Sequence, residues 1–331
     1  MMRFLLDDEQ REFARSLDAM LTASDTPGAV RAWAAGDTAP GRALWSRLTE
    51  AGLFTLAVPE PYEGLGPLPV ELVVAFTELG RHAVPGPLVE TVAAAAMIDR
   101  LGDHETAAAW LPRIASGKAV VSLCVPADGS PYALDPDAAD AVLVVEGDTL
   151  LLTEDAGTVQ PSADPARRLA RPLGGTVLAR GPQVAAAAAH AADVAALVTA
   201  AQALGLGRAL LDRTVAYVKQ RTQFGVAIGS FQAVKHRLAD TLLSLEFAQP
   251  LLYAAALALA GGDGPEAGRA IAAAKVAAGD AACTAARTAL QLHGAVGYTD
   301  ELDLSLWIRK ARPLREAWGT PTACRARVLT P

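Results

Sequence analysis

The chain has 331 residues and a formal net charge of −7, and its composition is 52% hydrophobic and 20% charged. This hydrophobic share is ample for a sizeable core and excludes a disordered polyelectrolyte. The acidic balance, with no block of Lys and Arg, argues against a nucleic-acid binder.

The first part of the chain, residues 1–118, alternates helical patterns with short turns. Acidic residues at Asp7–Glu9 mark the start of a helix, where negative charge is favoured. The stretch 58–69 is dense in Pro and Gly and predicts a loop. Further apolar periodicity predicts helices over about 70–81 and 88–101.

The middle of the chain, residues 119–183, changes to short β-branched runs such as AVLVVEG and GTVLARG, separated by Gly, Pro and Asp. These runs predict a small antiparallel β unit. The remainder, residues 184–331, returns to helical patterns. We expect helices over about 184–222, 231–259, 265–293 and 305–312. The whole pattern predicts a mostly α, α+β fold.

Cysteine usage and the apolar stretches bear on the compartment. Cys124, Cys283 and Cys324 are far apart, so we expect neither a disulfide framework nor a metal site. The N-terminal segment has no apolar core of the length that a signal peptide needs. The most apolar later stretch, residues 194–211, is interrupted by Gln, Gly and Arg. We therefore expect a cytoplasmic protein with no transmembrane helix.

Two segments are much more specific than composition. They are RTQFGVAIGSFQAVKHRLAD at Arg221–Asp240 and QLHGAVGYTDE at Gln291–Glu301. Both resemble signature segments of the acyl-CoA dehydrogenase family of flavoproteins, and their order and separation also match that family. The resemblance implies an N-terminal helical domain (1–118), a reduced β domain (119–183) and a C-terminal four-helix bundle (184–331).

The resemblance also implies FAD as cofactor. Arg221, at a helix end, would bind the pyrophosphate with two parallel hydrogen bonds. An isolated arginine there is better explained by the helix dipole, but the full segment favours the cofactor role. Glycines in the second segment would let backbone N–H groups approach a phosphate. In the family these segments reach the FAD of a neighbouring subunit, which implies at least a dimer. The implied cofactor-binding residues are Arg221, Gln223, Phe224, Gln291, Gly294, Gly297 and Thr320.

The chain departs from the family at the catalytic base. The family's reaction removes the α proton of an acyl thioester while a hydride passes from Cβ to the flavin, and it requires a carboxylate base. Most members carry a Glu directly before a Gly-Thr pair near the C-terminus, whereas this chain has Trp318 there. An indole cannot accept that proton. The alternative base position of some relatives and its neighbouring arginine position hold Ala195 and Ala196 here, and neither is acidic or basic. Glu316 would serve only if the loop were displaced.

The middle segment departs as well. Of the family's flavin-ring and thioester contacts, only faint echoes remain at Val125, Pro126, Gly129 and Ser130, and no Trp follows in the downstream strand. The chain thus keeps the residues that would touch a neighbour's FAD and lacks those that would hold the ring.

Three functions are compatible with this pattern. The first is a base-lacking subunit of a heteromeric, heterotetrameric acyl-CoA dehydrogenase, resembling the two-gene enzymes of actinobacterial sterol side-chain degradation. Its substrate would be an acyl-CoA thioester, and electron-transfer flavoprotein is the expected acceptor. The second is a self-sufficient homo-oligomeric flavoenzyme with Glu316 as a displaced base. The third is a non-catalytic scaffold or acyl-thioester binder.

Overall fold

The N-terminal part of the molecule is helical, as expected. The computed structural model describes residues 5–126, 130–153, 155–262 and 264–329. The helices here are α1 (Asp8–Thr22), α2 (Thr26–Ala34), α3 (Ala39–Glu50), α4 (Pro69–Arg81), α5 (Leu88–Leu101) and α6 (His104–Ala115). Asp7 and Gln10 form a reciprocal capping box at the start of α1. The predicted loop 58–69 contains the short 3₁₀ turn Glu60–Tyr62 and an isolated bridge between Pro59 and Gly66, and it ends where α4 begins at Pro69.

The middle segment forms two small sheets. The first has the order β1-β3-β4-β7, and the second has the order β2-β6-β5. Their strands are β1 (Val121–Cys124), β2 (Ala133–Leu134), β3 (Ala141–Glu146), β4 (Thr149–Thr153), β5 (Val159–Gln160), β6 (Leu169–Ala170) and β7 (Thr176–Arg180).

One strand pair contradicts the antiparallel prediction. β1 and β3 run parallel, with Val121 opposite Ala141, while the other pairs of both sheets are antiparallel. The reason lies in the connection between them. The Asp140 carboxylate accepts the backbone N–H of Val120 at 2.7 Å and is paired with Arg42 of α3, so the chain returns to the start of β1 before β3 begins.

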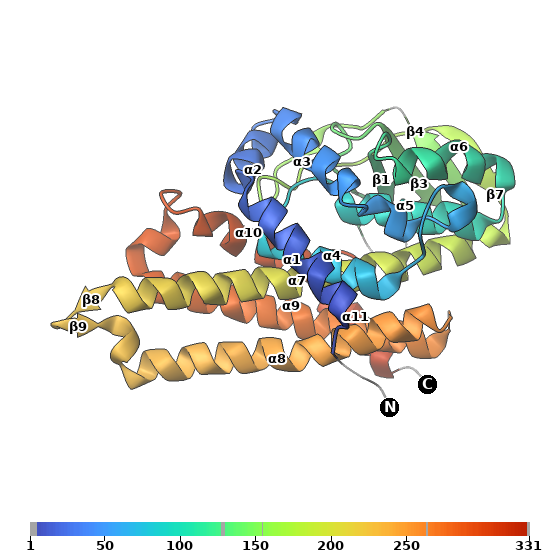
Figure 1. Cartoon of the computed structure of the whole chain (residues 1–331). Helices are drawn as coiled ribbons and strands as arrows, with labels where there is room; N and C mark the ends of the chain where they lie inside the picture. The colour runs from blue at the N-terminus through green and yellow to red at the C-terminus, as the bar shows by residue number, and fades with distance from the viewer. Residues whose placement is uncertain (1–4, 127–129, 154, 263, 330–331) are drawn as a thin grey trace.

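The C-terminal part is a helical bundle with a projecting hairpin (Figure 1). The predicted helix 305–312 is extended here to Leu304–Glu316, and the last helix was not predicted. The elements are α7 (Pro182–Gln220), β8 (Thr222–Gln223), β9 (Val226–Ala227), α8 (Gln232–Ala260), α9 (Pro265–His293), α10 (Leu304–Glu316) and α11 (Pro321–Leu329). The mostly α, α+β fold class is confirmed, with the small sheets between the two helical parts.

Helix α7 joins the two helical parts because it packs on α4 and α5 as well as on α9. Glycine makes the α4–α7 crossing possible. A Cβ at Gly80 would lie 2.0 Å from the carbonyl oxygen of Gln202, and one at Gly205 would lie 1.8 Å from that of Thr77. The apolar stretch 194–211 is therefore the core of this helix.

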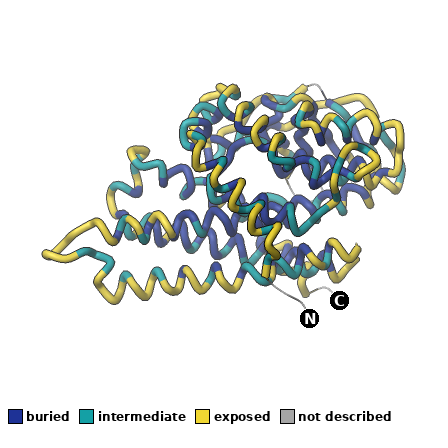
Figure 2. Tube along the Cα trace, viewed as in Figure 1, coloured by how far each residue is buried: buried dark blue, intermediate teal, exposed yellow. Residues whose placement is uncertain are grey.

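Helix α8 differs from α7 in its burial. Both helices are long and apolar enough to cross a membrane by composition alone, but in this fold they are bundle helices. The apolar residues of α7 are mostly buried, whereas much of α8 is exposed along the bundle (Figure 2). Leu243, Phe247 and Leu251 recur every fourth residue on α8, with 52%, 72% and 43% of their surface exposed. This spacing makes them one apolar stripe.

Candidate functional site

Two separate cavities hold most of the residues that the sequence singles out. The first, which we call the loop pocket, has a volume of about 470 Å³ and lies between the sheets and the Ala317–Thr320 loop that joins α10 to α11. Its polar walls include Glu90, Ser130, Tyr132, Ser162, Arg167, Arg312, Glu316 and Thr320. It therefore combines elements from all three parts of the chain.

Trp318 enters the loop pocket from a strained backbone. Its φ is 52° and that of Gly319 is 114°, so a bulky residue occupies the left-handed region directly before a glycine. Such backbone persists only where the surroundings hold it, and it is common at functional sites. Here the indole Nε1 donates a hydrogen bond of 3.0 Å to Oε1 of Glu90. The residue at the usual base position thus points directly at a carboxylate.

Glu90 is the feature of this pocket that sequence reasoning missed. It lies in the first turn of α5 and is only 2% exposed, yet it borders the cavity. Burial raises the pKa of its carboxyl above the ordinary value, while Arg167, the Trp318 hydrogen bond and Lys310 act in the opposite direction. Its Oε2 is buried without a hydrogen-bond partner. A lone acid in the apolar run LVETVAAAAM was the available signal.

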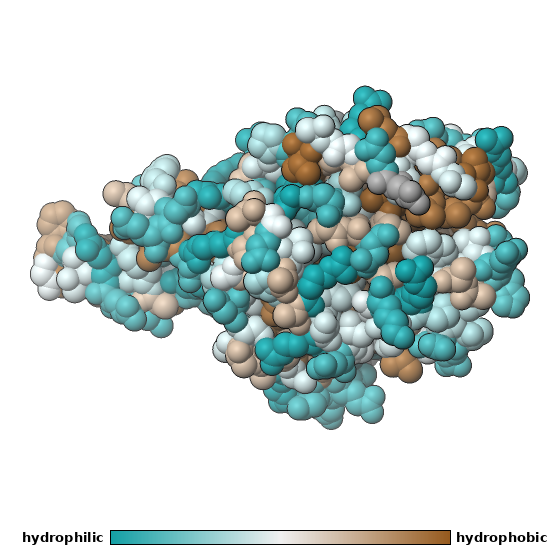
Figure 3. Space-filling view, turned by 90° about the horizontal axis from the view of Figure 1, so that it is seen from above, coloured by the Kyte–Doolittle hydropathy of each residue, from teal (hydrophilic) through white to brown (hydrophobic). Residues whose placement is uncertain are grey.

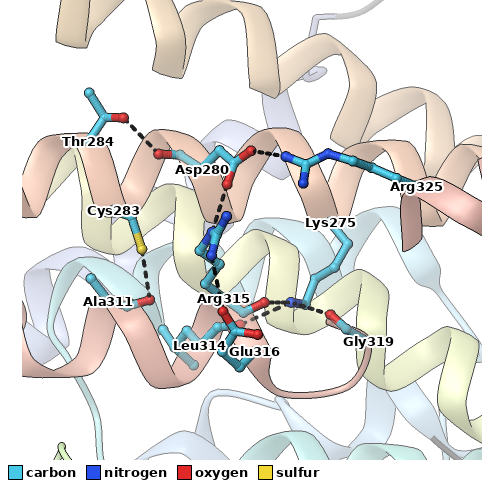
Figure 4. A network of polar contacts seen from close by, with 10 residues as sticks. All are labelled: Lys275, Asp280, Cys283, Thr284, Ala311, Leu314, Arg315, Glu316, Gly319 and Arg325. Atoms are coloured by element: carbon cyan, nitrogen blue, oxygen red, sulfur yellow. Dashed lines mark hydrogen bonds and ion pairs between the residues drawn. The ribbon is translucent and has the colours of Figure 1, made fainter. Parts of the chain in front are cut away.

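Lys275 holds the loop that carries Trp318 (Figure 4). Its buried Nζ donates to the carbonyl oxygens of Leu314 at 3.0 Å, Arg315 at 2.9 Å and Gly319 at 3.3 Å. Burial lowers the pKa of this amine to about 8. The amine satisfies carbonyls that the end of α10 leaves unpaired, and it fixes the direction in which the loop leaves the helix.

The other predicted residues near this loop are peripheral. Glu316 borders the pocket, but its Oε1 accepts a hydrogen bond of 3.0 Å from Arg315 and 44% of its side chain is exposed. Thr320 borders the pocket too, and its Oγ1 accepts the N–H of Ala323 at the start of α11. Of the faint middle-segment echoes, Val125 and Ser130 line the cavity, whereas Pro126 does not. Gly129 lies outside the described residues.

A second cluster of buried charge lies behind the loop pocket. Glu90, Asp135, Arg167, Gln202 and Lys310 surround a small cavity beside it. Lys310 forms a 2.8 Å ion pair with Asp164, and both side chains are almost fully buried. Burial raises the pKa of Asp135 to about 7, and its Oδ2 has no hydrogen-bond partner.

The second cavity, which we call the hairpin pocket, has a volume of about 340 Å³ at the end of the bundle that carries the β8–β9 hairpin. It brings together four predicted residues from segments about 70 positions apart, which is the distance that α8 and α9 span. These four are Arg221, Gln223, Gln291 and Gly294. His293 lies beneath them, where its ring stacks on Tyr217 at 4.1 Å and its Nδ1 bonds to the carbonyl of Ala289.

Two other predicted cofactor residues lie outside the hairpin pocket. Phe224 is at the tip of the hairpin and is 92% exposed, with its ring edge-on to Phe231 at 6.4 Å. Phe224 and Gly225 both have positive φ, which gives the two-residue turn the hand that suits a hairpin. Gly297 is buried in the turn after α9. The projecting tip carries hydrophobic surface (Figure 3).

The donors of the hairpin pocket fit an anionic group such as the FAD pyrophosphate. Arg221 supplies a guanidinium, and Gln223 and Gln291 supply two amides; all three residues are exposed. A guanidinium pairs with phosphate through two parallel hydrogen bonds. The set can hold the phosphate end of a dinucleotide, and it offers no enclosed cavity for the flavin ring.

One further group of side chains has metal-like spacing among the described residues. Ligand atoms of Asp18, Glu78 and His82 lie within 4.8 Å of one another. His82 Nε2 is bonded to Asp18 Oδ1 at 2.8 Å, and Arg81 Nε lies 3.4 Å from Glu78 Oε2. These contacts tie α1 to α4 and already supply Glu78 with a cation.

Comparisons with known proteins cover both helical parts. Residues 7–118 match the acyl-CoA dehydrogenase N-terminal domain, and residues 185–328 match the acyl-CoA dehydrogenase C-terminal domain. The acyl-CoA dehydrogenase IpdE2 of Mycobacterium tuberculosis (strain ATCC 25618 / H37Rv) is 34% identical over 318 residues, which is 95% of this chain and 94% of that protein.

Solved structures share the whole fold. A structure described as "Tcur3481-Tcur3483 steroid ACAD G363A variant" superposes with a TM-score of 0.83 at 27% identity, over 97% of this chain and 96% of that one. A chain of the ChsE4-ChsE5 complex from Mycobacterium tuberculosis gives a TM-score of 0.84 at 24% identity, over the full length of both chains. At that identity the second match shows the fold alone.

Proposed function

The chain belongs to the acyl-CoA dehydrogenase family, and from this premise we propose that it is one subunit of a heteromeric, FAD-dependent enzyme that desaturates an acyl-CoA thioester. The family consists of flavoprotein oxidoreductases that act on CH–CH bonds. In the proposal, a longer homologous subunit supplies the flavin-ring pocket and the Glu before the Gly-Thr pair. This chain supplies phosphate contacts to the shared FAD, which when bound accepts the hydride.

The observation that carries the proposal is the asymmetry between the two ends of the implied cofactor site. Arg221, Gln223 and Gln291 converge on one exposed pocket of the projecting bundle end. The residue before Gly319 is an indole, and the middle segment retains little of the family's ring-binding pattern. A chain that keeps phosphate donors while its sequence lacks the family's ring-binding residues is expected where the ring belongs to another subunit.

The apolar stripe on α8 supports association. Leu243, Phe247 and Leu251 would bury most of their surface against the helices of a second subunit, which favours assembly by the hydrophobic effect. The matched structures described as Tcur3481-Tcur3483 and the ChsE4-ChsE5 complex each name two proteins, which supports a partner subunit. The proposal includes a cytoplasmic location and electron-transfer flavoprotein as the electron acceptor. It also includes three domains, at residues 1–118, 119–183 and 184–331.

The test is flavin retention with and without a partner. The chain is purified alone and after co-expression with a longer homologue that carries the Glu, and flavin absorbance is measured in both. We expect a colourless lone chain, a yellow complex, and desaturation of acyl-CoA by the complex only. A lone chain that purifies yellow and is rapidly bleached by acyl-CoA would contradict the proposal.

The self-sufficient enzyme is the second candidate, because Glu316 does border the loop pocket. It predicts a yellow homo-oligomer whose bleaching by acyl-CoA is lost on Glu316→Gln. The third candidate, a scaffold or thioester binder, predicts no flavin in either preparation. The same two purifications therefore separate all three functions.

A further inference from the structure

Two arginines line the loop pocket without a hydrogen bond or ion pair for their side chains within the part of the chain that the structure describes. They are Arg167, which lies two residues before β6, and Arg312 on α10. We propose that the two guanidinium groups form a binding site for a small apolar carboxylate, that is, a carboxylate head on a hydrocarbon body. The site lies within this one chain, so the inference goes beyond the proposed function and requires neither FAD nor a second subunit.

The neighbouring arginines of the same two segments are paired with carboxylates. These pairs are Arg168–Asp137, Arg309–Asp300 and Arg315–Asp280. Arg167 and Arg312 differ from them because both border a cavity, where Arg167 is half-buried and Arg312 is exposed. A guanidinium presents a planar fork of N–H donors that matches the two oxygens of a carboxylate. Two such forks on one cavity, with no carboxylate of the described chain bonded to them, point to an anionic ligand.

A buried ion pair ties together the two segments that carry these arginines. Asp164 pairs with Lys310 at 2.8 Å, and neither side chain is more than 4% exposed. The carbonyl oxygen of Asp164 accepts the backbone N–H of Arg167 at 2.9 Å, and its carboxylate accepts that of Ala166 at 3.0 Å. Lys310 precedes Arg312 by two residues on α10. Both arginines therefore extend from backbone that is already fixed, which lowers the entropy cost of binding a ligand between them.

Three acids near the pocket limit its positive charge without bonding to the two arginines. Glu316 accepts a hydrogen bond from Arg315 instead. Oε2 of Glu90 and Oδ2 of Asp135 have no hydrogen-bond partner, so Arg167 acts on these two acids through charge alone. Because the acids already contribute negative charge, a singly charged carboxylate suits the site better than a doubly charged phosphate.

The rest of the wall suits a hydrocarbon body. The cavity of about 470 Å³ is lined by the apolar groups of Leu123, Val125, Leu134, Leu169, Pro313 and Trp318. Covering these side chains with an alkyl chain removes apolar surface from water, which favours binding. Tyr132 and Ser162 add hydroxyl groups that can donate to the carboxylate head. A ligand that offered charge alone would leave the apolar wall in contact with water.

The experiment measures octanoate binding to the purified full chain by isothermal titration calorimetry, at low and at high salt. Octanamide has the same hydrocarbon chain with a neutral head and is the matched ligand. We expect saturable one-to-one binding of octanoate that weakens as salt is added, and binding of octanamide that is weaker by about tenfold or more. Octyl phosphate tests the head group and should bind no more tightly than octanoate.

Two variants test the arginines. Arg167→Gln and Arg312→Gln each remove one guanidinium and keep a polar side chain, and each should weaken octanoate binding by about tenfold while leaving octanamide binding unchanged. Arg309→Gln is the matched control, because Arg309 lies one turn before Arg312 on α10, is paired with Asp300 and does not border the pocket. It should bind octanoate as the native chain does. Thermal melting of each variant checks that it is folded, and octanoate should raise the native melting temperature.

Several outcomes would overturn the proposal. They are the absence of octanoate binding by the native chain, equal affinity for octanoate and octanamide, native affinity in both pocket variants, and an equal loss in Arg309→Gln. Tighter binding of octyl phosphate would overturn the assignment of a carboxylate head. The assay contains neither flavin nor a partner subunit, so its failure is distinct from failure of the heteromer.

Discussion

The chain makes a similar turn at the loop pocket and at the β8–β9 hairpin, but the aromatic side chains of the two turns lie in opposite environments. Phe224–Gly225 and Trp318–Gly319 are both aromatic–glycine pairs with positive φ. Phe224 then projects from the hairpin tip and is 92% exposed, whereas Trp318 packs inward and bonds to Glu90. The same backbone conformation thus places an aromatic side chain on the surface in one turn and in the interior in the other.

The difference teaches which site is complete within one chain. In the loop pocket, Trp318 donates its indole N–H to Glu90 of the same chain, and Lys275 of the same chain holds the loop that carries Trp318. The hairpin end presents the polar side chains of Arg221, Gln223 and Gln291 and the exposed ring of Phe224 to the surroundings. Substitutions at the loop pocket should therefore change the stability of the lone chain, and substitutions at the hairpin end should change assembly and FAD binding instead.

The largest effect is expected at the exposed apolar stripe of α8. Phe247→Asp places a charge on the α8 stripe, and burying an unpaired charge against a partner costs several kcal/mol. We expect association to weaken by at least about a hundredfold in sedimentation analysis, with little change in the melting temperature of the lone chain. Phe247→Leu keeps the apolar surface and should associate nearly as the native chain does. Equal association of the Asp variant would remove α8 from the interface.

Asp135→Asn tests the buried side through pH. The folded-state pKa of Asp135, about 7, lies above the ordinary value of 3.8, so its stabilising contribution is present below pH 3.8 and is lost as the pH rises to 7. Asn keeps the hydrogen bond from the Arg168 N–H without the charge. At pH 8 the variant should be more stable by as much as about 4 kcal/mol in urea unfolding, and the gain should vanish near pH 4. A gain that does not depend on pH would contradict the assignment.

Arg221→Ala should act on FAD alone. Loss of a charge-assisted bidentate contact costs about 1.5–3 kcal/mol, which is roughly ten- to a hundredfold in affinity. The measurement is flavin titration of the assembled complex, with Lys219→Ala as control because it removes a nearby exposed cation from the same helix end. The lone chain should unfold at the native temperature. Unchanged flavin affinity would exclude Arg221 from the cofactor site.

The smallest effect is expected at Lys275. Lys275→Met removes the donor shared by three carbonyl oxygens but also relieves the burial of an amine whose pKa is lowered to about 8. The two terms oppose each other, and we expect a net loss of about 1–2 kcal/mol in urea unfolding at pH 7. Because the folded-state pKa is below the ordinary 10.5, the native chain should gain stability between pH 8 and 10.5, and the difference should widen there. A constant difference would show that the amine is not buried as described.

Regular elements were predictable where periodicity is long. The helices expected over 88–101 and 265–293 have those bounds in the structure, because apolar spacing and flanking Pro or Gly residues act locally. The nine-residue α11 was not predicted, since it is too short to show a period. The prediction of an antiparallel β unit was wrong for the β1–β3 pair, because the parallel pairing depends on the contact of Asp140 with Val120 and Arg42.

The sequence by itself determined the family and the fold, because two motifs and the helical patterns are properties of contiguous residues. The resemblance of those two motifs to the family also named the four residues that meet in the hairpin pocket. Only the tertiary structure decided the loop pocket. Glu90 and Trp318 are 228 positions apart, and they meet because α5 packs beneath a loop that Lys275 holds from a third helix. Such a contact depends on packing between distant elements, and no local pattern encodes it.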